Sequence, residues 1–266
     1  MMEPAAAIEA GLALAAAGAD WIDVGGESTR PGARVVPAEE EQARVLPVIE
    51  GLARSLRGST VISIDTYKAS TARAALAAGA TVVNDVSGGL LDPDLLAVAG
   101  AAGATVVLGH LRGEPATMME QVAFGDVVAE VTAELEERVA AARAAGCTKL
   151  WADPGVGFGK RAEHNLELLG ALPEIVKALA KLGVPLMVGV SRKAFIGQLT
   201  GKPVGERQLG TAAAVTASVL GGAAAVRVHE VAQARDVVAV AHAIGAARDA
   251  RNIRLSEVPV RPSRRL

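Results

Sequence analysis

Several short apolar segments of this chain end in carboxylate and amide side chains, which can bind a polar ligand. Asp65 ends the segment VISID, Asn84 and Asp85 end VVND, and Asp153 ends LWAD. Such groups are costly to bury unless they form hydrogen bonds. Because Asp accepts and Asn both accepts and donates, the set suits the edge of an amino-pyrimidinone ring, as in a pterin or guanine. Each could instead cap the helix that follows it, as Asp92 is expected to do.

Cationic groups follow two of the later apolar segments. Lys193, in GVSRKAFIG, comes just after a strand pattern and at the start of a helix pattern, so its ammonium can meet an anion or a ring oxygen. We expect Lys193 rather than Arg192 to point inward, and a surface charge is one reading of Arg192. Arg227 and His229 alternate in VRVHEV and so share one face of a strand, which suggests an anionic group such as phosphate. The alternative is an ion pair between Arg227 and Glu230 or another carboxylate of the barrel.

Two loops rich in Gly and Pro follow strand patterns and are further candidates for the site. They are STRPGAR, residues 28–34, and GVGFGK, residues 155–160. Loops that follow the strands of βα units build active sites, although either loop could be an inert connection. Phe158 lies between two glycines. We therefore expect it to be a wall of a substrate pocket rather than a core residue.

The elements that would position these residues form a regular alternation of strand and helix patterns. Short segments rich in Val and Ile recur between Ala-rich stretches of helical length, and the chain begins with a helix pattern. About eight helices are indicated. The expected strands lie within residues 21–28, 60–66, 81–85, 105–110, 150–154, 185–191 and 224–229.

This alternation fits either an open doubly wound sheet or a closed barrel. The Gly25-Gly26 pair is followed by Glu27, Ser28 and Thr29, so the dinucleotide-binding pattern G-x-G-x-x-G is absent. Polar residues end at least six of the strand patterns, and a barrel gathers such ends into one mouth. The sequence therefore predicts an α/β fold, a TIM (β/α)₈-type barrel with seven strands and eight helices recognisable and the first strand missing. We expect the barrel domain to cover residues 1–250 and a polar, loosely ordered tail to cover residues 251–266.

Composition excludes several classes of protein. The 266 residues carry a net charge of −2 with no basic block before the last residues, which argues against a nucleic-acid partner. Four His and one Cys argue against a zinc ribbon or a disulfide scaffold. Apolar residues make up 51%, yet every apolar run is interrupted before the ~18 residues that a membrane span needs. We expect a soluble, cytoplasmic protein with no membrane partner. No Ser-His-Asp order, Walker A loop or H-E-x-x-H pattern is present.

Taken together, six segments resemble the dihydropteroate synthase family. They are GADWIDVGGESTRPGA, SIDTYKA, VVNDVSGG, DPGVGFGK, VGVSRKAFIG and VRVHEV, and they occur in the family's order over residues 4–245. The resemblance implies condensation of 6-hydroxymethyl-7,8-dihydropterin pyrophosphate with 4-aminobenzoate, which yields 7,8-dihydropteroate and pyrophosphate in folate biosynthesis. It also implies small-molecule substrates and a homodimer formed through the late helices, of which residues 210–221 are unusually apolar.

The resemblance also implies roles for individual residues. Asp65, Asn84 and Asp153 would hold the pterin edge, and Lys193 would contact the ring oxygen and nitrogen. The pyrophosphate would be held by Arg30, Arg227 and His229. The aminobenzoate would be framed by Thr29, Pro31, Phe158 and the backbone near Ala194. Lys193, Asp65 and Arg227 would be the catalytic residues, and the substrate-binding set would also include Val86, Gly189 and Val228.

The chain departs from the family pattern at three places. It lacks the family's first strand and loop of the type NVTPDSFSDGG, whose Asn binds Mg²⁺ together with the pyrophosphate. We therefore expect Mg²⁺ to reach the site through the pyrophosphate alone, with no metal ligand from this chain. Gly109 stands where the family has Met, and Ala194 stands where Ser or Arg is common. A barrel without that strand would leave strand edges unpaired, which predicts low solubility or closure by a partner.

Two other functions fit parts of the pattern. A non-catalytic pterin-binding relative, truncated at its N-terminus, would keep the pterin residues without the reaction. A pterin-dependent methyltransferase of the corrinoid type shares the pterin-reading barrel. The segments STRPGA, SRK and RVHEV argue against the methyltransferase, because a methyl donor without pyrophosphate has no need for those cations.

Overall fold

The computed structural model describes residues 3–30, 32–120 and 122–256. In this part of the chain, seven strands alternate with ten α-helices and one short 3₁₀ helix. The strands are β1 (Trp21–Gly25), β2 (Val61–Asp65), β3 (Val82–Asp85), β4 (Thr105–Gly109), β5 (Lys149–Asp153), β6 (Met187–Gly189) and β7 (Ala225–Arg227). The helices are α1 (Pro4–Ala16), α2 (Ala38–Ser55), α3 (Ala69–Ala78), α4 (Leu95–Ala101), α5 (Val127–Ala144), α6 (Ala162–Gly170), α7 (Leu172–Ala180), α8 (Ala194–Thr200), η1 (Val204–Glu206), α9 (Gln208–Leu220) and α10 (Val231–Ser256).

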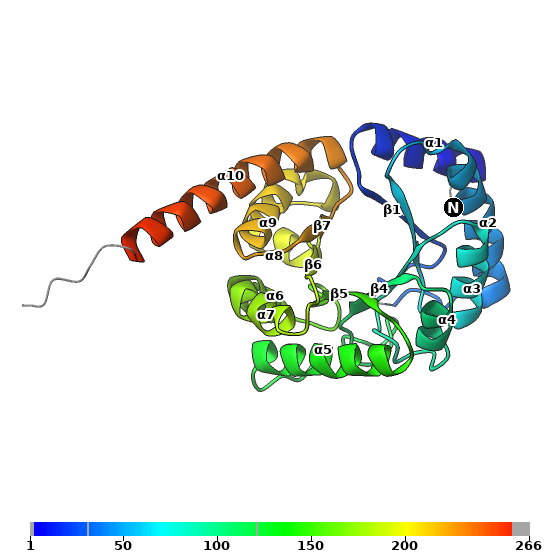
Figure 1. Ribbon diagram of the computed structural model, residues 1–266, viewed down its shortest axis with the longest axis horizontal. Coiled ribbons are helices and arrows are strands. Elements are labelled where there is room, and N and C mark those ends of the chain that lie inside the picture. The colour runs from blue at the N-terminus through cyan, green and yellow to red at the C-terminus, as the bar shows by residue number, and fades with distance from the viewer. Residues whose placement is uncertain (1–2, 31, 121, 257–266) are drawn as a thin grey trace, which may run out of the picture.

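The strands lie side by side in chain order and all pairs are parallel. One sheet has the order β1-β2-β3-β4-β5, and β6 pairs with β7. A bridge between Ala152 and Leu186 joins the end of β5 to the start of β6. The helices surround the strands on the outside (Figure 1). This is the TIM-type barrel that the sequence predicts, with its seven strands.

The two outer strands of this series, β7 and β1, are joined by side chains. No backbone pairing links them in the described residues. Instead, the guanidinium of Arg227 on β7 reaches Asp23 on β1, with Nε 2.6 Å from Oδ2. An ion pair therefore spans the place where the strand series begins and ends.

The helices differ in number and length from the prediction of eight. The segment before β6 forms two helices, because α6 ends at Gly170 and the first turn of α7 contains Pro173, which lacks a backbone N–H. A separate helix, α8, ends at Gly201, which has a φ of 70°. Finally, α10 continues across the predicted boundary at residue 250, since no Pro or Gly follows Gly245 until Pro259. Residues 251–256 are therefore helical, and residues 257–266 of the predicted tail lie outside the described part.

Alternation along the strands separates an outer core from a barrel interior. Outward residues such as Ile22, Ile64 and Val106 are buried against the helices. Inward residues Val82, Val107 and Met187 pack with Trp21 and Trp151 into a separate apolar cluster. The two Trp rings meet edge to face with centroids 5.2 Å apart. This cluster fills the interior near the amino ends of the strands, which leaves the polar inward residues at the carboxyl ends.

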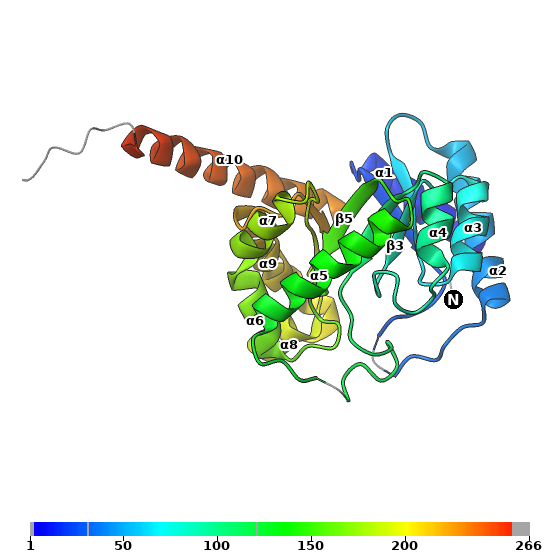
Figure 2. The ribbon, with the colours of Figure 1, turned by 60° about the horizontal axis from the view of Figure 1, so that its bottom comes forward.

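Two long loops meet at the carboxyl ends of the strands. The loop after β1 and the loop after β4 run together at the lower edge of Figure 2. The amide of Gly32 donates to the carbonyl of Ala116 at 3.3 Å. Both loops therefore border the mouth of the barrel. In the described part of the chain, no helix has the length and apolar character needed to cross a membrane.

Candidate active site

A small cavity of about 30 Å³ opens at the carboxyl ends of the strands. Strand register explains which residues meet there, because Asp65 lies beside Asn84, Gly109 beside Asp153, and Gly189 beside Arg227. The cavity brings together eight of the residues predicted from the sequence: Asp65, Asn84, Val86, Asp153, Phe158, Gly189, Lys193 and Arg227. Gly109, His110 and Gly155 complete its wall.

Arg227 lies between two carboxylates inside the barrel. Its Nε is 2.6 Å from Oδ2 of Asp23, and its Nη2 is 2.9 Å from Oδ2 of Asp65. The amide of Asn84 donates to the same oxygen of Asp23 at 3.0 Å. Arg227 therefore forms ion pairs with two other carboxylates of the barrel, and its side chain stays 45% exposed. Glu230 pairs with Arg192 instead.

The carboxylates of the cavity are hard to ionise. Burial, reinforced by the nearby Asp23, raises the pKa of Asp65 to about 7, while Arg227 opposes the rise. Burial also raises the pKa of Asp153, although the amide of Gly155 donates to its Oδ1 at 2.7 Å and Lys193 lies near. Both acids therefore stand where positive charge on a ligand would be strongly favoured.

Lys193 and Phe158 form another part of the cavity wall. The ammonium of Lys193 lies 3.9 Å from the centroid of the Phe158 ring, within the range of a cation–π contact. Burial lowers the pKa of Lys193 to about 8, with Asp153 opposing. Gly157 has a φ of 82°, and a Cβ there would lie 2.8 Å from Cδ of Lys193. The loop backbone therefore approaches the lysine as closely as a residue without a side chain allows.

A strained turn aims Lys193 into the cavity. The preceding residue, Arg192, has a φ of 57°, a left-handed conformation that is uncommon for a residue other than glycine. Its amide donates to Oγ1 of Thr211 at 3.0 Å, its carbonyl accepts from Arg207 at 3.0 Å, and its guanidinium pairs with Glu230. Arg192 is thus a structural residue of the turn rather than a surface charge, because three partners from later elements hold it.

The remaining predicted residues lie around the cavity rather than in its wall. His229 is exposed, and its Nδ1 is 2.8 Å from Oγ of Ser191. Partial desolvation of the ring and the nearby arginines lower its pKa, which favours the neutral imidazole. Thr29 and the exposed Arg30 lie on the loop after β1. Pro31 lies outside the described residues. Ala194, which begins α8, is exposed.

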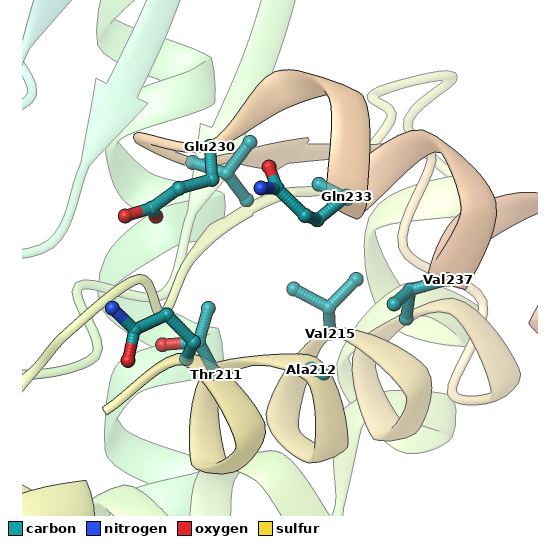
Figure 3. A pocket seen from close by; sticks show the side chains of 9 residues that line it. Thr211, Ala212, Val215, Glu230, Gln233 and Val237 are labelled. Carbon is teal, nitrogen blue, oxygen red and sulfur yellow. The ribbon is translucent and has the colours of Figure 1, made fainter. Parts of the chain in front are cut away.

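Val228 belongs to a second cavity of about 50 Å³ between α9 and the start of α10. Figure 3 shows Thr211 and Val215 of α9 facing Glu230 and Gln233 across it. Val228 and Arg227 therefore line different cavities, and a contact of Val228 with substrate stays a prediction. On β7 the side chains alternate, so Arg227 faces the barrel interior and Val228 faces the helices.

Asp23 is a site residue that sequence reasoning missed. It lies inward on β1, and its Oδ1 is buried without a hydrogen-bond partner. The signal that could have found it is alternation along the strand pattern WIDVG, in which Asp23 lies two residues before the end. The same alternation places Ser63 and Asp65 inward on β2. His110 is a second wall residue that sequence reasoning missed. It directly follows Gly109, the last inward residue of β4.

That Mg²⁺ reaches the site through the pyrophosphate stays a prediction for the described residues. Among them, no three His, Cys, Asp or Glu side chains are gathered so that they could hold a metal ion. The carboxylates of Asp23 and Asp65 share one arginine instead.

Comparison with known proteins identifies the class. A family model described as pterin binding enzyme matches residues 1–229. A dihydropteroate synthase of Synechocystis is 43% identical over 241 residues, which cover 90% of this chain and 81% of that protein. The Xanthomonas albilineans dihydropteroate synthase with 4-aminobenzoic acid has a TM-score of 0.83 at 43% identity, covering 91% of this chain and 85% of that one. The same enzyme in complex with 7,8-dihydropteroate has a TM-score of 0.80 at 40% identity, covering 92% and 87%.

The chain belongs to the pterin-binding enzyme family, TIM-type barrels with their site at the carboxyl ends of the strands. Within that family it falls among the dihydropteroate synthases, which are transferases of folate biosynthesis. The resemblance seen in the sequence is confirmed.

Proposed function

We propose that the cavity at the carboxyl ends of the strands binds the pterin pyrophosphate and transfers its pterin-methyl group to 4-aminobenzoate. The observation that carries this assignment is the convergence of Asp65, Asn84 and Asp153 with Lys193 in one enclosed space. The two acids and the amide match the amino-pyrimidinone edge of the pterin. Lys193 lines the same cavity as Asp153, and we propose that it contacts the ring oxygen and nitrogen.

The chemistry of this transfer is electrostatic. The bond between the pterin methylene carbon and the pyrophosphate oxygen breaks, and the electron pair leaves with the pyrophosphate. Asp65 and Asp153 stabilise the positive charge that develops on the pterin. The neutral arylamine then donates its lone pair to that carbon and loses one proton to solvent, so no strong general base is required.

Arg227 has a double role in this proposal. It favours the ionised form of Asp65 through the contact at 2.9 Å, and we assign the exposed part of its side chain to the departing pyrophosphate. Arg30 and His229 are proposed as further pyrophosphate contacts. Thr29, Pro31, Phe158 and the backbone at Ala194 are proposed to frame the aminobenzoate. Mg²⁺, which the family uses with the pyrophosphate, would arrive bound to the substrate oxygens.

A homodimer through the late helices is part of the same proposal. Leu209 on α9 is 87% exposed, and Val240 and Ile244 on α10 are 61% and 53% exposed. Side chains of this kind on adjacent helices are typical of a surface that another copy covers. A cytoplasmic location and the absence of a nucleic-acid partner stay predictions from the sequence.

Pyrophosphate release by the purified 266-residue chain tests the function. The chain is given the pterin pyrophosphate and Mg²⁺, with and without 4-aminobenzoate. We expect release that depends on 4-aminobenzoate. No release, combined with pterin binding measured by calorimetry, would contradict the proposal and favour a non-catalytic pterin-binding relative.

A further inference from the structure

The loop between β5 and α6 has little in its own sequence to hold its shape. Three of its glycines, Gly155, Gly157 and Gly159, have φ values of 67°, 82° and 57°. Glycine loses more conformational freedom on ordering than any other residue. Yet this loop carries Phe158, which stands against Lys193 in the cavity wall. Something outside the glycines must fix it.

The buried ammonium of Lys160 lies at the centre of this loop. The residue is only 4% exposed. Its Nζ donates to the carbonyls of Gly155 and Phe158, both at 3.1 Å, and lies 3.4 Å from the carbonyl of His110. It also lies 2.9 Å from Nδ1 of His110. The loop thus wraps its carbonyls around one cation.

His110 connects this lysine to helix α5. The ring is fully buried, and its Nε2 is 3.0 Å from Oε2 of Glu134. The other oxygen of this carboxylate, Oε1, accepts from Nε of Arg112 at 2.9 Å. Burial, with the nearby Lys160, lowers the pKa of His110, so the ring is neutral. Its partners assign the proton to Nε2, which donates to Glu134, and leave Nδ1 as the acceptor for Lys160. The lysine is therefore held by a rigid element outside the loop.

We propose that Lys160 is a positioning residue that fixes the Gly155–Gly159 loop so that Phe158 stands against Lys193, and that it thereby sets the affinity for the aromatic amine substrate. The assignment of the amine to this wall rests on the proposed function. Lys160 touches no substrate in this scheme and acts through Phe158.

The pterin side of the cavity depends less on this loop. Asp65, Asn84 and Asp153 lie on paired strands, and their positions follow from the strand register. The loop contributes one contact to them, from the amide of Gly155 to Asp153. Loss of the lysine should therefore weaken binding of the aromatic amine much more than binding of the pterin. A second anchor remains, because Oδ1 of Asn165 accepts from the amide of Gly157 at 2.6 Å, so the loop is loosened rather than released.

The test is Lys160→Met, with the exposed Lys177→Met on α7 as the matched control. We expect the KM for 4-aminobenzoate to rise on the order of tenfold or more, as misplacement of a substrate-positioning group does. The calorimetric Kd for the pterin pyrophosphate should stay within about threefold, and kcat should fall less than the KM rises. The control should match the wild type.

A double-mutant cycle with Phe158→Ala tests whether Lys160 acts through the aromatic ring. The KM increase of Lys160→Met should largely vanish in the Phe158→Ala background. Full additivity, an unchanged KM, or an equal loss of pterin affinity in a folded variant would each overturn the inference. If Lys160→Met does not fold, Lys160→Gln, which keeps N–H donors, is measured in the same way. A wild type without 4-aminobenzoate-dependent release would instead overturn the proposed function.

Discussion

At the scale of single residues, the site holds several carboxylates close together and few cations to pair with them. Asp23 and Asp65 both contact Arg227, and Oδ1 of Asp23 has no partner. Burial raises the pKa of Asp65 to about 7, and the nearby Asp23 adds to this rise while Arg227 opposes it. The same crowding makes the cavity favourable for a ligand that becomes positive as it reacts.

The pH dependence of the reaction follows from these shifts. Because Asp65 has a pKa of about 7, its carboxylate is lost as the pH falls below that value. Lys193 has a pKa of about 8, so its charge is lost as the pH rises above that value. We expect kcat/KM to pass through a maximum between the two, with a decrease of about tenfold per pH unit on the acid side.

The Asp65→Asn variant tests the assignment of the acid limb. It should lower kcat/KM by about 10²- to 10³-fold, the usual loss when one group that stabilises transition-state charge is removed. What activity remains should no longer decrease below pH 7. Asp94→Asn, at an exposed position before α4, is the control. An acid limb that survives in Asp65→Asn would assign it to another group.

At the scale of elements, local patterns predicted the strands and their inward residues, but not what those residues touch. Alternation within five residues is enough to place Asp65 and Asn84 inward. One partner of Arg227, Asp23, lies 204 residues earlier in the chain on β1, and no local sequence pattern can predict a contact over that separation. The left-handed Arg192 was likewise hidden, because Thr211 and Arg207, which hold it, follow in later segments.

The departure from the family pattern at Gly109 has a structural reason. A Cβ at this position would lie 2.7 Å from Cα and from the carbonyl oxygen of Val86, so the ends of β3 and β4 approach too closely for a side chain. We expect Gly109→Ala to destabilise the protein by about 1–3 kcal/mol, as overpacking does.

Thermal unfolding checks this expectation against a matched glycine. Gly170, at the end of α6, has no atom within 4 Å of an added Cβ. Gly170→Ala should therefore be neutral or slightly stabilising. Gly109→Ala should lower the Tm by several degrees, at about 2–4 °C per kcal/mol for a chain of this size. Equal melting of the two variants would refute the close approach of the strands.

At the scale of the whole molecule, the last helix, α10, is the part that protrudes. Figures 1 and 2 both show α10 running past α9 and away from the barrel. Exposed apolar side chains lie on these two helices. A protruding helix with such a surface is a costly feature for a monomer, since apolar area stays in water.

The Leu209→Glu variant tests the proposed homodimer. Burying a charge in an apolar interface is unfavourable, so the variant should sediment as a monomer where the wild type is a dimer. Leu166→Glu on α6, at a position that is 41% exposed, should leave the dimer intact. A monomeric wild type would refute the interface and leave the low solubility predicted from the sequence as the next property to measure.

The ion pair between β7 and β1 has a consequence for the order of folding. Asp23 and Arg227 are 204 residues apart, so the chain must close its largest loop before they meet. The helices and neighbouring strands need only short loops and can form earlier. On refolding from denaturant, we expect far-ultraviolet circular dichroism to recover before the ability to bind the pterin. Arg227→Met should leave the faster phase unchanged, because the cation contributes only to the last closure.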